Sequence, residues 1–463
     1  MYLFVIVYSF FLRIHAPFWF NLWGQHDYAI HPEYLKSIVE LRYFKTYNAP
    51  YYYLILAVIG LPFSIAYHFH IISDTAFLHS VTYLSHDVFF LLIIAGMYLL
   101  LKELSFNKLE TVAFIAMTVS SPVMQRSLNM IRPENFMLVA FIWLLLTMVR
   151  WWKHQKLNEN QILWKDKNLW YSIFLLSFIS AQKINGFVLL LSLLLISIFV
   201  LRGTVYKRFA LMIKPTAVII GFIVILLFFN YWFNHQWFFG IDNKDHKSYQ
   251  YKAPLSFFTT FDPKNMYANP LRNNQKNSIS GILLIDLYGD YWRYGTDFWR
   301  LDKIPPSRFK EFDHIRTRDD YYALETFNPY RLSMKFRKIR ARLGLTLSFT
   351  FLIFFILCFL ILTRRLFRKN GKQEIDFNKY ISYFLSSIIF PSLLFIVLLC
   401  RSRFSPEKGD HAKWEYIVWV IPLFAFVPIG LLSIIRKRNY KLLLHIILSI
   451  LMIGGLLQST YLG

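Results

Sequence analysis

The chain has 463 residues, of which 56% are hydrophobic, 19% aromatic and only 17% charged. Soluble domains carry about 25% charged residues, so this composition excludes a soluble or disordered chain. The net charge of +24 would suggest a nucleic-acid partner in a soluble protein, but no nucleic-acid-binding motif is present. Basic residues of membrane proteins gather in cytoplasmic loops and near anionic head groups. We therefore expect membrane lipids, and no nucleic acid, as partners.

Apolar residues gather in blocks of about 17 to 23 residues, the length that crosses the hydrocarbon core of a bilayer as a helix. The sequence therefore predicts an all-α polytopic membrane protein with an N-terminal transmembrane module (1–233), an external cap (234–342) and C-terminal transmembrane helices (343–463). The blocks lie near residues 1–20, 51–72, 82–101, 109–128, 135–152, 168–182, 185–201, 211–233, 343–363, 380–400, 414–432 and 441–461.

The predicted topology depends on block 51–72, which contains Gly60 and Pro62. If this block lies at the interface or enters the membrane as a bent helix without crossing, the predicted cytoplasmic loops carry 21 Lys and Arg and the short external loops 7. The positive-inside rule favours this arrangement. The sequence then predicts about eleven transmembrane helices with the N-terminus inside. The long polar stretches 21–50 and 234–342 both face the external side.

The first external loop contains the candidate catalytic residue. Asp27 follows the first apolar block directly, so its carboxylate is expected at the membrane surface, where it could accept a proton from an incoming hydroxyl. Alternatively, Asp27 starts an interfacial helix as its N-cap. His31 and Glu33 lie close by and are substrate-binding candidates. Their spacing with His26 is a weak metal pattern, so the sequence indicates neither a metal nor another cofactor.

Further charged residues lie between apolar blocks. Arg132 and Glu134 flank Pro133, and they either pair with each other or face the same cavity as Asp27. Lys183 separates the blocks 168–182 and 185–201, which we interpret as two crossings. An ionisable residue at such a place is a functional candidate, but it could also extend to the head groups. The aromatic segment Tyr51-Tyr52-Tyr53 is interpreted mainly as an aromatic belt at the interface.

The second group of candidates lies in the cap and in the loop 401–413. Asp290 belongs to a segment rich in aromatic and charged residues, which interfacial packing explains only in part. This loop is predicted to be external but carries several Lys and Arg residues, which the positive-inside rule does not expect. Anion binding is one reason for cations there. Attraction to anionic lipid is the other reason. The candidates for binding an anionic substrate in and beside this loop are Arg401, Arg403, Lys413 and Tyr416.

Taken in order, these segments resemble the C-type glycosyltransferase (GT-C) superfamily, which includes the protein mannosyltransferases and the lipid A aminoarabinose transferases. The resemblance is carried by an acidic first external loop, Asn48-Ala49-Pro50-Tyr51, Arg132-Pro133-Glu134, Lys183, and Gly409-Asp410-His411-Ala412-Lys413. It implies a GT-C bundle with interfacial helices in the first loop. The catalytic acid of the family corresponds to Asp27. Many members have two adjacent acids there, whereas the nearest second carboxylate in this chain is Glu33.

The resemblance implies that a sugar is transferred from a polyprenyl-phosphate donor to an acceptor hydroxyl, with inversion and without an obligatory metal. We expect a bacterial inner membrane protein with an outward-facing site. The acceptor could be a lipid, a glycan or a protein. Two alternatives are a transporter or flippase of lipid-linked saccharides and a polymerase or ligase of such saccharides. A transporter predicts charges deep in the helices and repeated halves, and neither is evident in the sequence.

Overall fold

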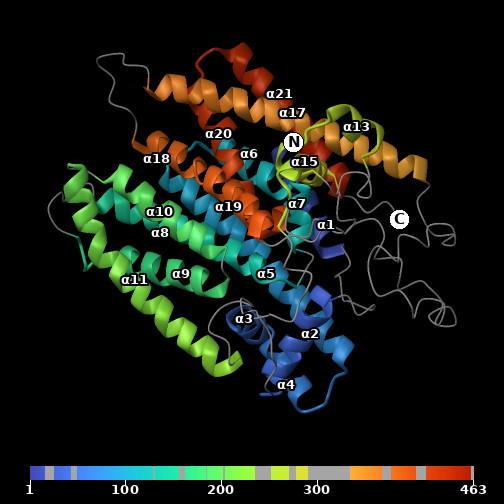
Figure 1. The fold of residues 1–463 in the computed structure, drawn as a ribbon, viewed down its shortest axis with the longest axis vertical. Helices are drawn as coiled ribbons and strands as arrows, with labels where there is room; N and C mark the ends of the chain where they lie inside the picture. Colours follow the sequence, from blue (N-terminus) through green and yellow to red (C-terminus); the bar gives the residue numbers. More distant parts are fainter. Residues whose placement is uncertain are drawn as a thin grey trace.

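The computed structural model describes residues 1–15, 26–42, 49–128, 131–155, 162–183, 185–201, 204–234, 252–270, 278–289, 334–367, 377–402 and 413–459. Within these residues all regular structure is helical, as predicted (Figure 1). The N-terminal half contains α1 (Tyr2–His15), α2 (His26–Val39), α3 (Tyr51–Ile59), α4 (Leu61–His68), α5 (Asp74–Glu103), α6 (Lys108–Val119), α7 (Pro122–Leu128), α8 (Pro133–Gln155), α9 (Lys167–Gln182), α10 (Gly186–Val200) and α11 (Val205–Asn234). The remaining elements are α12 (Leu255–Thr259), α13 (Pro263–Ala268), α15 (Ile279–Tyr288), α17 (Met334–Phe367), α18 (Phe377–Ser386), α19 (Ile389–Ser402), the short 3-10 helix η5 (Trp414–Ile417), α20 (Val420–Ile434) and α21 (Arg438–Ser459).

Six helices in the described part of the chain are long and apolar enough to cross a membrane, or seven if the bent pair α3–α4 counts as one span. Four shorter apolar helices accompany them: Tyr2–Ile14, Gly186–Val200, Ile279–Tyr288 and Val420–Ile434. The structure therefore confirms a polytopic helical bundle. The number of eleven crossings and the division into three modules remain predictions.

Local sequence signals explain where several helices begin. Ser73 precedes α5, and its hydroxyl accepts a hydrogen bond from the amide of Ala76 at 3.3 Å. Asn107 and Glu110 form a capping box at the start of α6. Asp166 accepts a hydrogen bond from the Asn168 amide at 2.8 Å and so starts α9. Such side chains satisfy amide groups that have no partner within the first turn of a helix.

Helices α1 and α5 run in opposite directions. Phe10 stacks on Phe90 with 5.6 Å between ring centroids, and Arg13 lies 3.4 Å from the carboxylate of Asp87. As residue numbers rise along α1, the numbers of the residues that they contact in α5 fall, so the two helix axes are antiparallel. The end of α1 and the start of α5 therefore lie at one end of the bundle, which we call the Asp74 end.

The bent pair α3–α4 lies between these two helices in the sequence. Its axis changes by 95° at a break of one residue, Gly60. A Cβ atom at Gly60 would clash with the side chain of Val81 in α5, so only glycine allows the bend to pack so closely there. Because α1 ends and α5 begins at the Asp74 end, the segment between them makes no net crossing. This supports the bent, non-crossing segment predicted from the charges.

The next helices return repeatedly to the Asp74 end. Helix α8 is parallel to α5, because Phe89 contacts Phe136 near the start of α8 and Glu103 pairs with Lys153 near its end at 3.2 Å. Helix α9 is antiparallel to α8, since the Ser172 hydroxyl donates to Thr147 while Lys183 reaches the start of α8. Helix α10 then runs parallel to α8. The blocks 168–182 and 185–201 are thus two packed helices rather than one kinked helix.

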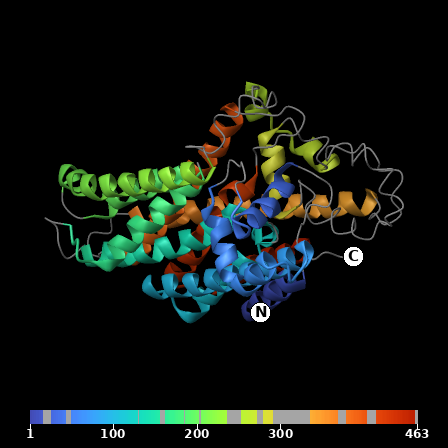
Figure 2. The same cartoon turned by 90° about the horizontal axis from the view of Figure 1, so that it is seen from below.

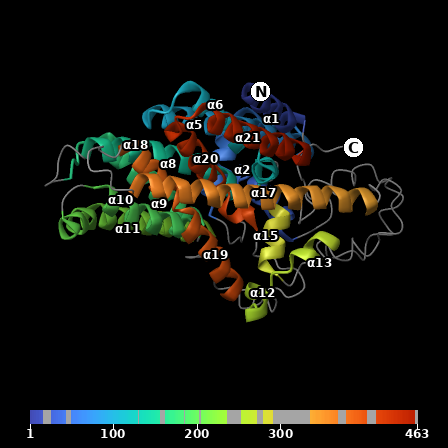
Figure 3. The same cartoon turned by 90° about the horizontal axis from the view of Figure 1, so that it is seen from above.

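The remaining helices complete the bundle. Helices α1, α6 and α21 lie on one face of the molecule and α11 on the opposite face (Figures 2 and 3). Exposed apolar side chains along α11, including Ile213, Ile220 and Val224, fit a surface in contact with lipid. Helix α17 extends beyond the bundle and packs against α15 (Figure 3). Near its start, the Arg342 guanidinium donates to the carbonyl of Tyr267 in α13 at 2.8 Å.

Candidate functional site

Charged side chains from α8, the α9–α10 turn and η5 meet at the Asp74 end. The Lys183 ammonium donates a hydrogen bond to Glu134 Oε1 at 2.5 Å and lies 5.1 Å from the centroid of the Tyr416 ring. The Lys413 ammonium lies 5.8 Å from the same ring. Glu134 and Lys413 are 1% and 4% exposed, and the Lys183 side chain is 24% exposed. Together with Arg132, we call these residues the Lys183 cluster.

The turn between α9 and α10 presents Lys183 to this cluster. Lys183 follows the last helical residue of α9 and has extended backbone angles, φ −160° and ψ 150°, so the helix stops there. The chain reverses within three residues, and the Gly186 amide donates to the Lys183 carbonyl at 2.9 Å. A Cβ atom at Gly186 would overlap the carbonyl oxygen of Ile179. The tight reversal therefore needs glycine at this position.

The cluster suits a bound anion. Its described side chains include three cations, Arg132, Lys183 and Lys413, and one carboxylate, Glu134. The face of the Tyr416 ring attracts both ammonium groups, since an aromatic face carries negative partial charge. Buried ammonium and guanidinium groups offer many hydrogen-bond donors in fixed positions, which phosphate oxygens can accept.

The structure shows which partner Glu134 and Lys183 have. The ammonium of Lys183 binds the buried carboxylate of Glu134. Glu134 forms its ion pair with Lys183, while Arg132 is buried close by and adds a second positive charge near the same carboxylate. The structure thus brings Arg132, Glu134 and Lys183 together, with Glu134 paired to Lys183, and their role in a substrate site remains a prediction.

A second buried polar group adjoins this cluster. The Tyr52 hydroxyl lies 2.9 Å from His86 Nε2 and is also hydrogen-bonded with Asn135 and the backbone of Arg132. Beside His86 in α5, Asp87 pairs with the fully buried Arg13 of α1. Arg13, His86 and Asp87 were not among the residues predicted from the sequence. Arg13 could have been recognised as a candidate, because it is a charged residue inside an apolar block.

The tyrosine segment at the start of α3 corrects a prediction. Tyr51, Tyr52 and Tyr53 are all buried within the protein, so they do not form an aromatic belt in contact with the interface. Tyr53 packs on Tyr34 of α2 with 4.4 Å between ring centroids, and Tyr51 packs on Phe178 of α9 at 5.1 Å. These tyrosines hold α2 and α9 against α3.

The predicted catalytic residue lies in the first turn of α2. Helix α2 begins at His26 and packs against α3 and α4, so Asp27 is its second residue and not its N-cap. Leu35 is fully buried, but Leu41 lies beyond the helix and is 87% exposed, with φ 55°. The side chains of Asp27 and His31 lie outside the described part of the structure. The role of Asp27 therefore remains a prediction.

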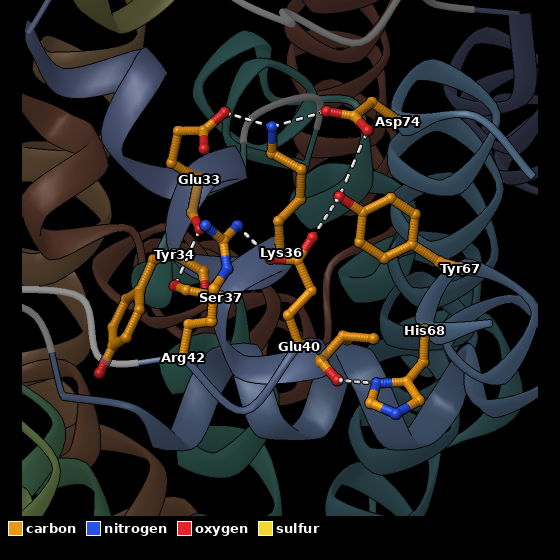
Figure 4. A network of polar contacts seen from close by, with 10 residues as sticks. Glu33, Tyr34, Lys36, Ser37, Glu40, Arg42, Tyr67, His68 and Asp74 are labelled. Carbon is orange, nitrogen blue, oxygen red and sulfur yellow. Dashed lines mark hydrogen bonds and ion pairs between the residues drawn. The ribbon is translucent and has the colours of Figure 1, made fainter. Parts of the chain in front are cut away.

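Glu33 belongs to a network that joins α2 to α4 and α5 (Figure 4). Lys36 pairs with Glu33 and, at 2.8 Å, with Asp74. The Tyr67 hydroxyl donates to Glu40 at 2.8 Å and to Asp74 at 3.3 Å. The bond from Lys36 lowers the pKa of Asp74. Burial alone would lower the pKa of Lys36, but its bonds to Asp74 and Glu33 raise it. Both groups therefore stay ionised at neutral pH and hold α2 in place.

The remaining candidates do not join the cluster in the described structure. The Arg401 guanidinium donates to the carbonyl of Ala253 at 2.7 Å, and the Ala253 amide donates to the Cys400 carbonyl at 3.3 Å. Arg401 thus ties the end of α19 to the segment before α12. Asp290 and Arg403 lie outside the described residues.

A buried ion pair connects the predicted cap to the site. Arg126 of α7 pairs with Asp286 of α15 at 3.1 Å and donates to the carbonyl oxygens of Asp286 and Gly289 at the end of that helix. The Trp414 indole, next to Lys413, donates to the carbonyl of Leu283 at 2.8 Å. Helix α15 therefore supports both α7 and η5. Among the described residues, no three His, Cys, Asp or Glu side chains form a group that could hold a metal ion.

Comparisons with known proteins show a shared fold at very low sequence identity. No protein-family model and no curated protein matches the sequence significantly. The crystal structure of the Archaeoglobus fulgidus oligosaccharyltransferase in its apo form is 11% identical, with a TM-score of 0.50 over 99% of this chain and 56% of that one. A structure of the oligosaccharyltransferase AglB of that archaeon, with an inhibitory peptide and a dolichol-phosphate, is 12% identical over 99% and 55% of the two chains, with a TM-score of 0.49.

The chain thus spans a little more than half the length of the oligosaccharyltransferase it resembles. The likeness confirms the predicted GT-C-like architecture. A closer relation to the protein mannosyltransferases or the aminoarabinose transferases stays a prediction.

Proposed function

We propose that this protein is a membrane glycosyltransferase that moves a sugar from a polyprenyl-phosphate donor to an acceptor hydroxyl. The observation that carries the proposal is the Lys183 cluster, because it gathers buried and half-buried cations from distant parts of the chain at one end of the bundle. The end of α1, after which α2 and its Asp27 follow, lies at the same end. The fold shared with an oligosaccharyltransferase supports this assignment.

In the proposed reaction, the carboxylate of Asp27 accepts the proton of the acceptor hydroxyl. The acceptor oxygen forms a bond to the anomeric carbon while the bond from that carbon to the phosphate oxygen breaks. The electron pair of the broken bond leaves with the polyprenyl phosphate from the opposite face, so the configuration is inverted. Lys183, Lys413 and Arg132 stabilise the negative charge that develops on this phosphate. Glu134 keeps the Lys183 ammonium in place through their hydrogen bond.

The proposal includes the place of the reaction. We place the site at the external face of a bacterial inner membrane, because the positive-inside rule assigns the Lys-rich short loops to the cytoplasm. The transferred sugar is a hexose or a pentose, and the acceptor is a lipid, a glycan or a protein. Arg401 and Arg403 are further candidates for binding the donor phosphate.

A transfer assay with purified protein tests this function. The wild type and the Asp27→Asn variant are incubated with a panel of polyprenyl-phosphate sugars and detergent-solubilised membrane acceptors. We expect transfer by the wild type and its loss in Asp27→Asn, with unchanged thermal unfolding. Glu103→Gln is the matched control, because it makes the same chemical change at the end of α5 remote from Asp74 and should keep the activity.

Two results would overturn the proposal. One is full activity of Asp27→Asn. The other is movement of the intact lipid-linked sugar across vesicles by the wild type, without any release of polyprenyl phosphate, which is the behaviour of a flippase.

A further inference from the structure

Three buried oxygen atoms, on the partner of Lys183 and on two residues of the same turn, accept no hydrogen bond from the described part of the chain. They are Gln182 Oε1, Asn185 Oδ1 and Glu134 Oε2. Gln182 and Asn185 are 0% and 2% exposed and flank Lys183 in the α9–α10 turn. Glu134 holds the Lys183 ammonium through its other oxygen. We call these three atoms the acceptor triad.

The orientation of both amide groups is fixed by their neighbours. Gln182 Nε2 donates to the carbonyl oxygen of Ala49 at 3.2 Å, and Asn185 Nδ2 donates to the carbonyl oxygen of Tyr416 at 2.6 Å. A carbonyl oxygen can only accept, so the nitrogen of each amide must face it. Rotating either amide would bring two acceptors together. Each side chain therefore has an oxygen left that requires a donor.

Buried polar atoms are nearly always hydrogen-bonded, since leaving one without a partner costs as much as losing a hydrogen bond. Three such acceptors beside one lysine call for a ligand with several hydroxyl donors. Apolar lipid cannot supply them, and phosphate oxygens at neutral pH are mainly acceptors. A sugar supplies hydroxyl donors at closely spaced positions. In a glycosyl phosphate the sugar is bonded directly to the phosphate. The triad likewise belongs to Glu134, the partner of the Lys183 ammonium, and to two residues of the turn that carries Lys183.

We infer that Gln182 and Asn185, together with Glu134 Oε2, accept hydrogen bonds from hydroxyl groups of the sugar that the donor lipid carries. This inference rests on the proposed function and deepens it, because it assigns the sugar-recognising part of the same site. The Lys183 ammonium binds the phosphate, and the amides of Gln182 and Asn185 recognise the sugar. These residues are specificity-determining, and they take no part in the transfer of the proton.

A binding experiment separates sugar recognition from phosphate recognition. The affinities of decaprenyl phosphate, decaprenyl-phosphate mannose and decaprenyl-phosphate glucose are measured for the wild type, Gln182→Met and Asn185→Leu. Both substitutions keep the approximate side-chain shape and remove the whole amide, which is the acceptor oxygen and the donor to Ala49 or Tyr416. We expect the wild type to bind at least one sugar-bearing lipid more tightly than the bare lipid. In each variant the affinity for the sugar-bearing lipid should fall about threefold to tenfold, which corresponds to the loss of one neutral hydrogen bond. The affinity for the bare lipid should stay unchanged.

Gln155→Met is the matched control. Gln155 is also a buried amide, but its Oε1 accepts the amide hydrogen of Leu163 at 3.1 Å, near the end of α8. Its replacement should lower the temperature of unfolding and leave the sugar-dependent difference in affinity unchanged. Deoxy analogues of the bound sugar give a second test. The loss caused by Gln182→Met should vanish for the analogue that lacks the hydroxyl bound by Gln182.

Each outcome has a distinct meaning. If the variants weaken all three lipids equally, or weaken none, the amides have a structural role or bind only buried water, and the inference is wrong while the proposed function stands. If the wild type binds no sugar-bearing lipid better than bare decaprenyl phosphate but still transfers sugar, the inference also fails alone. If it neither binds nor transfers these sugars, the proposed function fails with it.

Discussion

The ion pair between Lys183 and Glu134 combines a structural and a functional role, and the two can be separated. Lys183→Met leaves a buried carboxylate without its partner, which costs about 3–5 kcal/mol. It also removes a cation from the proposed leaving group, so we expect transfer to fall about 100-fold. The double variant Lys183→Met/Glu134→Gln removes the uncompensated charge. Its thermal unfolding should return toward that of the wild type, while initial rates of transfer stay low. Recovery of transfer in the double variant would show that the pair is only structural.

The sequence predicted some residues of the site but not the contacts that depend on tertiary packing. Lys183, Arg132, Glu134 and Lys413 stand out because charged residues next to apolar blocks are rare and need a reason. The pairing of Asp87 with Arg13 could not be predicted, since it depends on the antiparallel packing of α1 and α5. Burial of the tyrosines at the start of α3 also depends on tertiary packing, because an aromatic belt and a buried aromatic cluster have the same composition.

Among the elements, the α9–α10 turn is the one on which the site depends most directly. In Gly186→Ala, the new methyl group would overlap the backbone oxygen of Ile179, which cannot move aside without distorting α9. We expect a loss of about 1–3 kcal/mol, as for overpacking in a close-packed interior, and weaker binding of the donor because Lys183 is displaced. Thermal unfolding and donor binding measure the two effects.

Gly221→Ala is the control for this prediction. A Cβ atom at Gly221, within α11, meets nothing within 4 Å, and alanine favours a helix by about 1 kcal/mol over glycine. This variant should be as stable as the wild type or more stable, with unchanged donor binding. Equal stability of Gly186→Ala and Gly221→Ala would contradict the role assigned to the turn.

Every apolar block in the sequence contains helix in the structure, but the ends and breaks of helices were less predictable. Block 109–128 is divided into α6 and α7. A Cβ atom at Gly455 of α21 would overlap the carbonyl of Ser120, so the break lies where another helix packs against the backbone. Helix α17 begins at Met334, before the apolar block near 343, because polar residues extend the helix beyond the bundle. Hydropathy locates what is buried in lipid and does not mark where a helix ends.

For the whole molecule, charge counting and packing agree on the path of the chain. The loop charges favour a segment 51–72 that does not cross, and the antiparallel packing of α1 and α5 requires the same. The start of α1 lies near the start of α21, since the Tyr2 hydroxyl is 2.6 Å from His445 Nδ1. The first turns of α5 and α21, which contain residues 76 and 439, are therefore expected on opposite sides of the membrane.

Cysteine labelling tests this topology. Ala76 and Asn439 are exposed near the starts of α5 and α21, and the native Cys358 and Cys400 are buried and should give little background. In intact cells, a membrane-impermeant maleimide should label Ala76→Cys, while Asn439→Cys should react only after permeabilisation. If 51–72 crossed, every later loop would change sides and both results would be reversed. The Lys183 cluster would then face the cytoplasm, so the outcome also decides on which side the donor lipid must be supplied.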